Sequence, residues 1–454
     1  MRVHFIAIGG SAMHNLALAM HASGHDVTGS DDEIFEPSLS RLRNAGILPD
    51  KMGWDASRIT SDLDAVILGM HARNDNQELI RARELGLSIQ SYPEFIYSVS
   101  QNKKRVVIGG SHGKTTVTSM IMHVLKSCQV DFDYLVGAQL EGFERMVRIS
   151  DAPLIVIEGD EYLSSPLDLR PKFHWYRPHV AIVTGIAWDH INVFPTWENY
   201  LEQFDIFLSL IEDNGVLVYN SDDTNLVALA EKQKGRITLE PYATPPHVIR
   251  NGVTALQVNG HETLLQVFGK HNLQNLAGAM HVCMHLGISK ADFLSAISTF
   301  QGAAKRLEKI AETQDAVVFK DFAHAPSKLK AALSAVREQF PERSLTAVME
   351  LHTFSSLNKA FLSQYAGCMD PADRAIVYFN PHTIEHKRLE PISTEQVKEA
   401  FGKPDLEVFT DAKELVRELK DFAWQNSALL LMTSGNFEGV DLNAFGRELL
   451  ERSL

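Results

Sequence analysis

Cysteine is scarce in this chain of 454 residues, which contains only Cys128, Cys283 and Cys368. They lie far apart, and no CxxC or Cys/His spacing accompanies them, which argues against a disulfide framework or a zinc module. No run of about 18 apolar residues, the length of a membrane-spanning helix, occurs either. Because the N-terminus enters an apolar strand pattern without the basic flank of a signal peptide, we expect a cytoplasmic protein that does not bind membranes.

Positive charge is also in short supply. The chain has 43 Lys and Arg residues against 57 Asp and Glu residues, a net charge of −14. A general binder of nucleic acid or of membrane surfaces would normally carry a basic field, so we expect neither kind of partner. Small anionic ligands held by a few local groups remain open. The apolar share of 45% is typical of folded globular proteins, and the length predicts about three domains.

Apolar runs alternate with helical patterns along the chain, which predicts an α/β fold with parallel sheets covered by helices. The first unit is a strand over residues 3–8, a glycine turn and a helix over residues 11–22. A polar stretch at residues 98–104 and a new α/β block from Gln301 mark two boundaries. We predict three domains, at residues 1–100, 101–301 and 302–454.

A glycine-rich segment, Gly109–Thr116, lies between a predicted strand and a predicted helix. Its glycines let backbone N–H groups close around phosphate oxygens, and the helix N-terminus adds the positive end of its dipole. Lys114 would neutralise phosphate charge, and the Thr115 hydroxyl could bind Mg²⁺. The segment is one residue shorter than the general phosphate-loop pattern, which would need glycine where the chain has Ile108.

A second glycine turn, Gly9–Ala12, follows the first predicted strand, and Asp31 ends the next one. The spacing is that of a degenerate dinucleotide-binding motif with its ribose-binding carboxylate. By itself the motif is weak, and a tight turn without a ligand explains it equally well.

Acidic side chains follow two further predicted strands of the central region. Glu158–Glu161 comes after one strand, and Asp189 and His190 come after the next. Both groups lie at the carboxyl ends of predicted parallel strands, where ligands bind in open α/β sheets. They could meet the phosphate loop and hold a divalent ion through oxygen and imidazole ligands. Solvated loop acids and a hydrogen-bonded loop histidine are the alternative.

Five motifs in series resemble the Mur ligase family, the ATP-dependent amide-forming enzymes of peptidoglycan metabolism. They occur in the family's order and approximate spacing over essentially the whole chain: Gly110–Thr116, Glu158–Glu161, Asp189–His190, Gly269–Asn275 and Asp321–Pro326. The resemblance implies an N-terminal Rossmann-like domain that binds UDP, a central phosphate-loop ATPase domain, and a C-terminal Rossmann-like domain. It also implies ATP and Mg²⁺ as cofactors.

The resemblance assigns roles to particular residues. Lys114, Glu158 and His190 would be catalytic, and Mg²⁺ would be held by Thr115, Glu158 and His190. ATP would be bound by Gly110, Ser111, His112, Gly113, Lys114, Thr115, Thr116, His271, Asn272, Asn275, Arg306, Asp321 and His324. The other substrates would be bound by Gly9, Gly10, Ser11, Met13, Ser30, Asp31, His71 and His352.

Within the family, two amine substrates are open. Tyr162 stands where we expect serine in an L-alanine-adding enzyme, and segments 172–178 and 434–440 also resemble the tripeptide-adding enzyme. The favoured prediction is therefore a ligase of peptidoglycan recycling that joins L-Ala-γ-D-Glu-meso-diaminopimelate, the murein tripeptide, to UDP-N-acetylmuramate. The alternative is a ligase that adds L-alanine in de novo synthesis. We expect a monomer or weak homodimer.

Other interpretations follow from single motifs. His190 could act as a general base toward the amine instead of as a metal ligand, since its unperturbed pKa lies near neutral pH. The phosphate loop could serve a non-catalytic, nucleotide-driven switch. A nicotinamide-dependent oxidoreductase, suggested by Gly9 and Asp31, would leave the phosphate loop unexplained.

Overall fold

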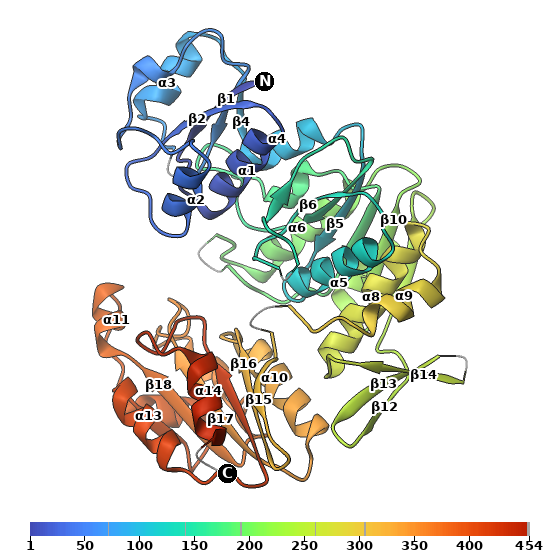
Figure 1. Cartoon of the computed structure of the whole chain (residues 1–454), viewed down its shortest axis with the longest axis vertical. Helices are drawn as coiled ribbons and strands as arrows, with labels where there is room; N and C mark the ends of the chain where they lie inside the picture. Colours follow the sequence, from blue (N-terminus) through green and yellow to red (C-terminus); the bar gives the residue numbers. More distant parts are fainter. Residues whose placement is uncertain (71, 141, 191–192, 259, 304–305, 452–454) are drawn as a thin grey trace. The chain divides into compact units, whose positions relative to one another are not determined.

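The computed structural model covers residues 1–454 and describes all of them except 71, 141, 191–192, 259, 304–305 and 452–454. The chain folds into two compact units (Figure 1): Met1–Ala243 with Gln274–Ile297, and Thr244–Leu273 with Ser298–Leu454. Among the described residues, every helix is too short or too polar to cross a membrane.

The first unit begins with a four-stranded parallel sheet in the order β2-β1-β3-β4. Its strands are β1 (Arg2–Ile6), β2 (Asp26–Ser30), β3 (Ala65–Leu68) and β4 (Ile89–Ser91). Its helices are α1 (Ser11–Ala22), α2 (Ser38–Asn44), α3 (Gln77–Glu84) and α4 (Tyr92–Val99), with a 3₁₀ turn at Ala56–Arg58. Val3 and Phe5 pack into one apolar cluster and Ile6 into another, so β1 is covered on both faces, as parallel strands require.

A seven-stranded sheet follows, in the order β11-β10-β9-β5-β8-β6-β7. Only β7 runs antiparallel to its neighbour. The strands are β5 (Lys104–Gly109), β6 (Asp133–Leu135), β7 (Val147–Arg148), β8 (Leu154–Glu158), β9 (Val180–Val183), β10 (Val216–Asn220) and β11 (Thr238–Tyr242). The helices are α5 (Lys114–Ser127), α6 (Trp197–Ser209), α7 (Thr224–Glu231), α8 (Lys270–His285) and α9 (Lys290–Ile297), with a 3₁₀ turn at Lys172–Trp175. Phe173 of the 3₁₀ turn stacks on Phe207 of α6 at 4.5 Å between ring centroids.

The second unit contains two sheets. A small antiparallel one consists of β12 (His247–Arg250), β13 (Val253–Val258) and β14 (His261–Leu265). The larger has the order β15-β16-β20-β17-β18-β19 and is parallel except for β15. Its strands are β15 (Glu308–Glu312), β16 (Ala316–Asp321), β17 (Ser344–Leu351), β18 (Arg374–Phe379), β19 (Glu407–Phe409) and β20 (Ser427–Met432). Its helices are α10 (Pro326–Gln339), α11 (Pro381–His386), α12 (Thr394–Phe401), α13 (Ala412–Asp421) and α14 (Leu442–Glu451), with a 3₁₀ turn at Leu362–Tyr365.

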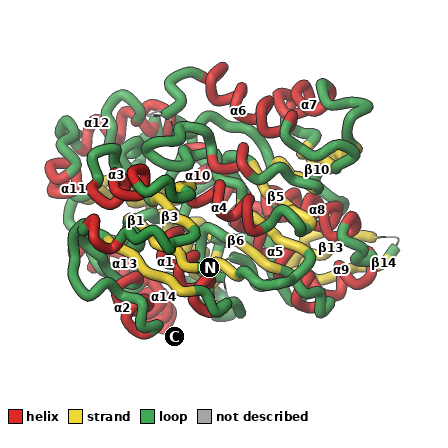
Figure 2. Tube along the Cα trace, turned by 90° about the horizontal axis from the view of Figure 1, so that it is seen from above, coloured by secondary structure: helices red, strands yellow, loops and turns green. Residues whose placement is uncertain are grey.

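The predicted fold class is confirmed: largely parallel sheets are covered by helices in each unit, with strands in yellow and helices in red in Figure 2. The polar stretch near residue 100 lies between α4 and β5, and residue 301 lies between α9 and β15. The three-domain division, the cytoplasmic location and the monomeric or weakly dimeric state stay predictions. Each large sheet brings its strand ends, and the polar residues that follow them, to one edge.

Candidate active site

The predicted phosphate loop connects β5 to α5 in the central sheet. Gly110 and Gly113 have φ of +128° and +81°, a conformation that residues with side chains rarely adopt. A Cβ at Gly113 would lie 2.5 Å from Asn275 Oδ1, and one at Gly110 would overlap the Thr184 hydroxyl. The loop is packed so tightly that both positions require glycine.

The remaining residues of the loop lie around the first turn of α5. The His112 ring contacts the Ser111 carbonyl through Nδ1 at 2.7 Å, and the Thr184 hydroxyl donates to the His112 carbonyl. Thr116 is buried in the first turn of the helix. The structure therefore brings all the predicted loop residues together at the N-terminus of α5.

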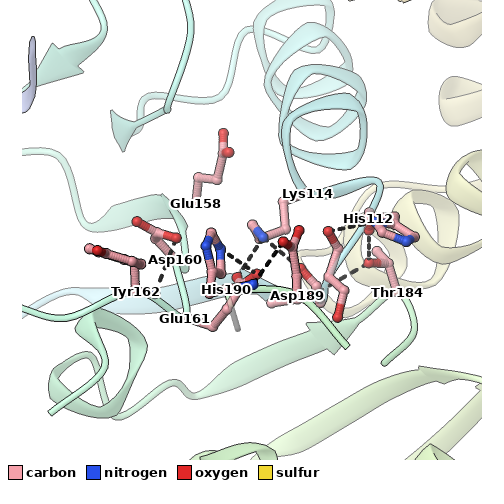
Figure 3. Close-up of polar contacts among 12 residues, drawn as sticks. His112, Lys114, Glu158, Asp160, Glu161, Tyr162, Thr184, Asp189 and His190 are labelled. Carbon is pink, nitrogen blue, oxygen red and sulfur yellow. Dashed lines mark hydrogen bonds and ion pairs between the residues drawn. The ribbon is translucent and has the colours of Figure 1, made fainter. Parts of the chain in front are cut away.

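Lys114 points from the start of α5 into a group of carboxylates (Figure 3). Its Nζ donates to Glu161 Oε2 at 2.5 Å and to the Gly110 carbonyl at 2.7 Å. Burial acts to lower the pKa of Lys114, but the charges of Glu161, Asp160 and Glu158 outweigh it and hold the pKa above its ordinary value. Lys114 is therefore a permanent cation at this edge of the sheet.

Glu161 is the most enclosed acid of the site, with 1% of its surface exposed. Burial acts to raise the pKa of its carboxyl, but Lys114 and His190 hold that pKa well below its usual range. Its Oε1 lies 3.5 Å from His190 Nε2 and accepts a hydrogen bond from the Tyr200 hydroxyl at 3.3 Å. Burial acts to lower the pKa of His190, but Glu161 and Asp189 raise it above the usual value. The two residues form an ion pair on the edge of the loop.

Glu158 ends β8 on the other side of the phosphate loop. Its Oε1 accepts a hydrogen bond from the Thr115 hydroxyl at 2.9 Å, and its Oε2 accepts one from the Gly137 N–H at 2.9 Å. Burial raises the pKa of this carboxyl. Thr115, in the first turn of α5, and Glu158, at the end of β8, are thus brought together.

Two oxygen-rich groups could hold a divalent cation. One is the pair of Thr115 and Glu158. In the other, one ligand atom from each of Asp160, Glu161 and His190 lies within 4.8 Å of the other two. Carboxylate and hydroxyl oxygens are the ligands that Mg²⁺ prefers, so the oxygen donors of both groups fit that ion, and His190 would add an imidazole nitrogen. The structure thus pairs two of the predicted ligands, Thr115 and Glu158, and places the third, His190, beside Glu161, which was not predicted as a ligand.

Tyr200 is the site residue that the sequence did not reveal. It lies on α6, is fully buried, and its hydroxyl is 2.7 Å from Ser111 Oγ in the phosphate loop. In sequence an aromatic residue on an amphipathic helix indicates core packing, and nothing local distinguishes Tyr200 from its neighbours. Only the fold brings it to Glu161.

The predicted nucleotide ligands of the second unit gather around Asp321 at the end of β16. Its carboxylate accepts hydrogen bonds from the Leu307 and Ala323 N–H groups at 2.7 Å and 2.6 Å, and burial raises its pKa. Arg306 lies over the Phe322 ring at 5.1 Å. The second unit therefore places Arg306 and Asp321 together, and His324 follows three residues after Asp321.

Three further predicted nucleotide ligands lie on α8. Burial lowers the pKa of His271 to about 4, and the charge of Arg306 adds to this effect, so its ring is neutral. The Asn272 side chain donates to the Phe268 carbonyl at 2.9 Å. Asn275 lies against the phosphate loop at Gly113. Asn275 and the loop are thus in contact within the first unit.

The glycine turn after β1 is tied to Asp31 at the end of β2. The Gly9 N–H donates to Asp31 Oδ2 at 2.7 Å, and a Cβ at Gly9 would lie 2.9 Å from the same oxygen. Burial raises the pKa of Asp31 to about 6. Gly10 precedes α1, with Ser11 exposed and Met13 buried at its start.

The Ser30 side chain is engaged in a buried hydrogen-bond network with Glu78 and His4. It is fully buried, and its hydroxyl donates to Glu78, which also contacts His4 Nε2 at 3.3 Å. A cavity of about 530 Å³ opens nearby and is lined by Asp32, Trp54, Met70, Arg73, Asp75, Asn76 and Gln77. Of these, the exposed Arg73 is the cation that sequence reasoning missed. His71 lies outside the described residues.

His352 follows β17 in the second unit. Its Nδ1 lies 3.7 Å from Glu350 Oε1, and a Cβ at Gly435 would lie 2.7 Å from the same nitrogen. Glu350 also accepts hydrogen bonds from the Phe437 N–H at 3.1 Å and from the Thr433 hydroxyl. His352 is therefore placed between the ends of β17 and β20.

Three family profiles match the chain in succession. They are described as "Mur ligase family, catalytic domain" at residues 2–104, "Mur ligase middle domain" at residues 108–283, and "Mur ligase, glutamate ligase domain" at residues 305–435.

Individual proteins are also similar. The UDP-N-acetylmuramate–L-alanine ligase of Paenarthrobacter aurescens is 33% identical over 83% of this chain and 82% of its own length. A crystal structure of the UDP-N-acetylmuramate–alanine ligase of Thermotoga maritima superposes with a TM-score of 0.70 at 23% identity, over 100% of this chain and 99% of that one. The UDP-N-acetylmuramate:L-alanyl-γ-D-glutamyl-meso-diaminopimelate ligase of Neisseria meningitides superposes with a TM-score of 0.59 at 25% identity, over 66% of this chain and 98% of that one.

Proposed function

The chain belongs to the Mur ligase family of ATP-dependent amide-forming ligases, and from this premise we propose that it joins an amine to the lactyl carboxylate of UDP-N-acetylmuramate. The observation that carries this proposal is the glycine loop closed on Lys114 beside Glu158 and the buried Glu161. Both acids lie at the carboxyl edge of the central sheet, where the phosphates of ATP would bind at the N-terminus of α5.

The chemistry needs an activated carboxylate, because a free carboxylate is a poor electrophile at neutral pH. Phosphorylation of the lactyl carboxylate by ATP gives an acyl phosphate, which the amine attacks with loss of phosphate. The loop N–H groups and Lys114 would hold the phosphates and offset the charge that develops on the transferred group. Mg²⁺, when bound, supplies further charge neutralisation between the phosphates, and Thr115, Glu158 and His190 are the proposed ligands.

The other substrate sites are proposed from the remaining clusters. Arg306, Asp321 and His271 of the second unit would contact the nucleotide. The cavity beside Asp32 and Arg73, next to the Gly9 turn, would hold the uridine diphosphate, with Arg73 offsetting diphosphate charge.

For the amine, the comparisons support L-alanine better than the murein tripeptide that the motifs favoured. The Paenarthrobacter aurescens relative, at 33% identity, carries L-alanine in its name, so L-alanine is the first candidate. The tripeptide is the second candidate, supported by the Neisseria meningitides structure and by Tyr162. The Tyr162 ring meets the His190 ring edge-on at 5.1 Å, so the residue on which the tripeptide prediction partly rests lies beside His190.

The experiment is a product assay with UDP-N-acetylmuramate, ATP and Mg²⁺, in which L-alanine and the tripeptide compete for the enzyme. Mass spectrometry separates the two amide products by mass. Preferential formation of the L-alanine product supports the first candidate, and preferential formation of the tripeptide product supports the second. If neither amide forms, the proposed amine class is wrong. ATP hydrolysis that needs neither co-substrate would instead indicate a nucleotide-driven switch.

A further inference from the structure

Glu161 uses both of its carboxylate oxygens inside the first unit. Oε2 holds the Lys114 ammonium at 2.5 Å. Oε1 lies 3.5 Å from His190 Nε2 (Figure 3). The same oxygen accepts a hydrogen bond from the Tyr200 hydroxyl. With 1% of its surface exposed, Glu161 cannot exchange these partners for water without a local rearrangement. One buried carboxylate therefore links the phosphate-loop lysine to the histidine after β9.

A directed chain of hydrogen bonds extends this link to the phosphate loop. The Ala187 N–H donates to Ser111 Oγ at 2.9 Å, and Ser111 Oγ lies 2.7 Å from the Tyr200 oxygen. Because the Tyr200 hydroxyl donates its proton to Glu161, its oxygen accepts the proton of Ser111. The direction of each hydrogen bond in this series therefore depends on the negative charge of Glu161.

The same ammonium that Glu161 holds is the one that a phosphate group would take. Charge-assisted hydrogen bonds to carboxylate and to phosphate are of similar strength, so the two anions compete for Lys114. We propose that Glu161 is a positioning residue. It holds the Lys114 ammonium against the loop until a nucleotide phosphate takes the place of the Glu161 carboxylate as the partner of Lys114. The freed carboxylate then orients His190 and Tyr200. The proposal rests on the proposed function, because it assigns a step within ATP binding and ligation.

Two other roles for Glu161 make different predictions. A metal ligand would strengthen the binding of Mg²⁺ and ATP, so its removal would weaken both binding and turnover. A purely structural ion pair would change thermal stability, with binding and turnover falling in parallel. A competitor of phosphate instead weakens ATP binding while it supports turnover, so its removal must move the two quantities in opposite directions.

The experiment compares Glu161→Gln with the unaltered chain. Glutamine keeps the size of the side chain and an oxygen for Tyr200, but it removes the charge. We expect the dissociation constant of ATP, measured by calorimetry with Mg²⁺ and without UDP-N-acetylmuramate, to fall about tenfold. We expect kcat for ligation to fall about 100-fold, because His190 and Tyr200 lose their anchor.

Three further variants keep the test decisive if Glu161→Gln folds poorly. Glu161→Asp retains the negative charge, so it should bind ATP as tightly as the unaltered chain does. Its kcat should lie between the values of Glu161→Gln and the unaltered chain. Tyr200→Phe should lower kcat without tightening ATP binding, because Lys114 keeps its carboxylate. Glu202→Gln, an exposed position on the same helix as Tyr200, is the matched control and should change neither quantity.

Weaker ATP binding in Glu161→Gln, or equal binding and equal kcat, would overturn the proposal. The measurement of ATP binding needs neither UDP-N-acetylmuramate nor the amine. It therefore tests the role of Glu161 separately from the proposed ligase function. A chain that binds ATP but forms no amide contradicts the proposed function, whereas the ratio of ATP affinities between the two chains still tests the role of Glu161.

Discussion

At the scale of single residues, the phosphate-loop site is a balance of charges in a buried setting. Lys114 faces Glu161 directly and is further stabilised as a cation by Asp160 and Glu158. Taking one partner from a buried pair leaves an uncompensated charge, which costs more free energy than the pair itself contributes. Loss of Lys114 leaves the Glu161 carboxylate without this cation, and loss of Glu161 leaves the Lys114 ammonium without its nearest carboxylate.

The first prediction concerns Lys114→Ala. Loss of the ammonium should lower kcat for ligation by about 10³-fold or more, because nothing else in the loop offsets phosphate charge as a full cation. Binding of UDP-N-acetylmuramate, measured by calorimetry, should stay within about twofold of the unaltered chain. Lys126→Ala, at an exposed position near the other end of α5, is the control. Retained turnover in Lys114→Ala would contradict the assignment of the ATP site.

The second prediction concerns the pH dependence of Asp31. Burial raises the pKa of this carboxyl to about 6 from an ordinary value of 3.8. The protonated form is therefore favoured by folding, and the stability that it contributes is present below about pH 4 and is lost as the pH rises through about 6. Asp31→Asn should thus stabilise the chain above pH 6 and have little effect near pH 4.

The size of this effect is limited by solvent screening and by the hydrogen bond from Gly9, so we expect about 1–2 kcal/mol at about pH 8. The measurement is thermal unfolding of both chains between about pH 4 and pH 8, in the absence of substrates. A difference between the chains that does not grow with pH would contradict the raised pKa.

The roles of residues could be predicted from the sequence only where the residues belong to a local motif. Lys114 and Thr115 belong to the glycine loop, and Glu158 and His190 follow apolar strands, so their place at one sheet edge was foreseeable. Tyr200 reaches Glu161 only through the packing of α6, which no local pattern encodes. Ser30 was predicted to bind substrate, but its hydroxyl donates to Glu78. This contact joins two elements far apart in the chain, so no local pattern predicts it.

At the scale of elements, the central strands were more predictable than the edges of the sheets. The apolar runs at residues 154–157, 180–184 and 216–219 predict strands, and they correspond to β8, β9 and β10, which lie inside the sheet. The edge strand β7 has two residues, too few to show any periodicity. Its position depends on pairing with β6 and not on its own sequence.

The third prediction tests the geometry of the turn between β5 and α5. Gly110→Ala places a Cβ against both the hydroxyl and the backbone nitrogen of Thr184, at a φ of +128°. We expect a loss of about 2–4 kcal/mol in the free energy of unfolding and loss of ATP binding. Denaturant unfolding and calorimetry measure the two effects.

The matched control is Gly235→Ala, which also has a positive φ, +86°, but nothing within 4 Å of the added Cβ. It should cost about 1 kcal/mol from backbone strain alone and leave ATP binding unchanged. Equal effects at the two positions would show that the close contact with Thr184 is not what the loop requires.

At the scale of the whole molecule, net charge and local chemistry point in different directions. The chain carries a net charge of −14 but belongs to a family of ATP-dependent ligases. Phosphate would be held by loop N–H groups, a helix N-terminus and Lys114, which do not alter the overall balance. Composition is therefore uninformative about a nucleotide site built from few groups, and the expectation that the chain does not bind nucleic acid stays a prediction.

The division of the chain into units shows where composition fails in another way. The sequence predicts boundaries near residues 100 and 301, the first from the polar stretch at residues 98–104 and the second from the start of a new α/β block. The small sheet of β12, β13 and β14 belongs to the second unit although it precedes α8, which ends in the first. Membership of a unit depends on long-range packing, and a chain that leaves and re-enters a unit gives no local signal.

The most direct test of the account follows the oxygen atoms of the lactyl carboxylate. UDP-N-acetylmuramate labelled with oxygen-18 in that carboxylate is incubated with ATP, Mg²⁺ and the preferred amine, and the released phosphate is analysed by mass spectrometry. An acyl-phosphate route transfers one labelled oxygen to phosphate and leaves the other in the amide carbonyl. Phosphate without label, or phosphate released equally fast without UDP-N-acetylmuramate, would contradict ATP-dependent ligation by this chain.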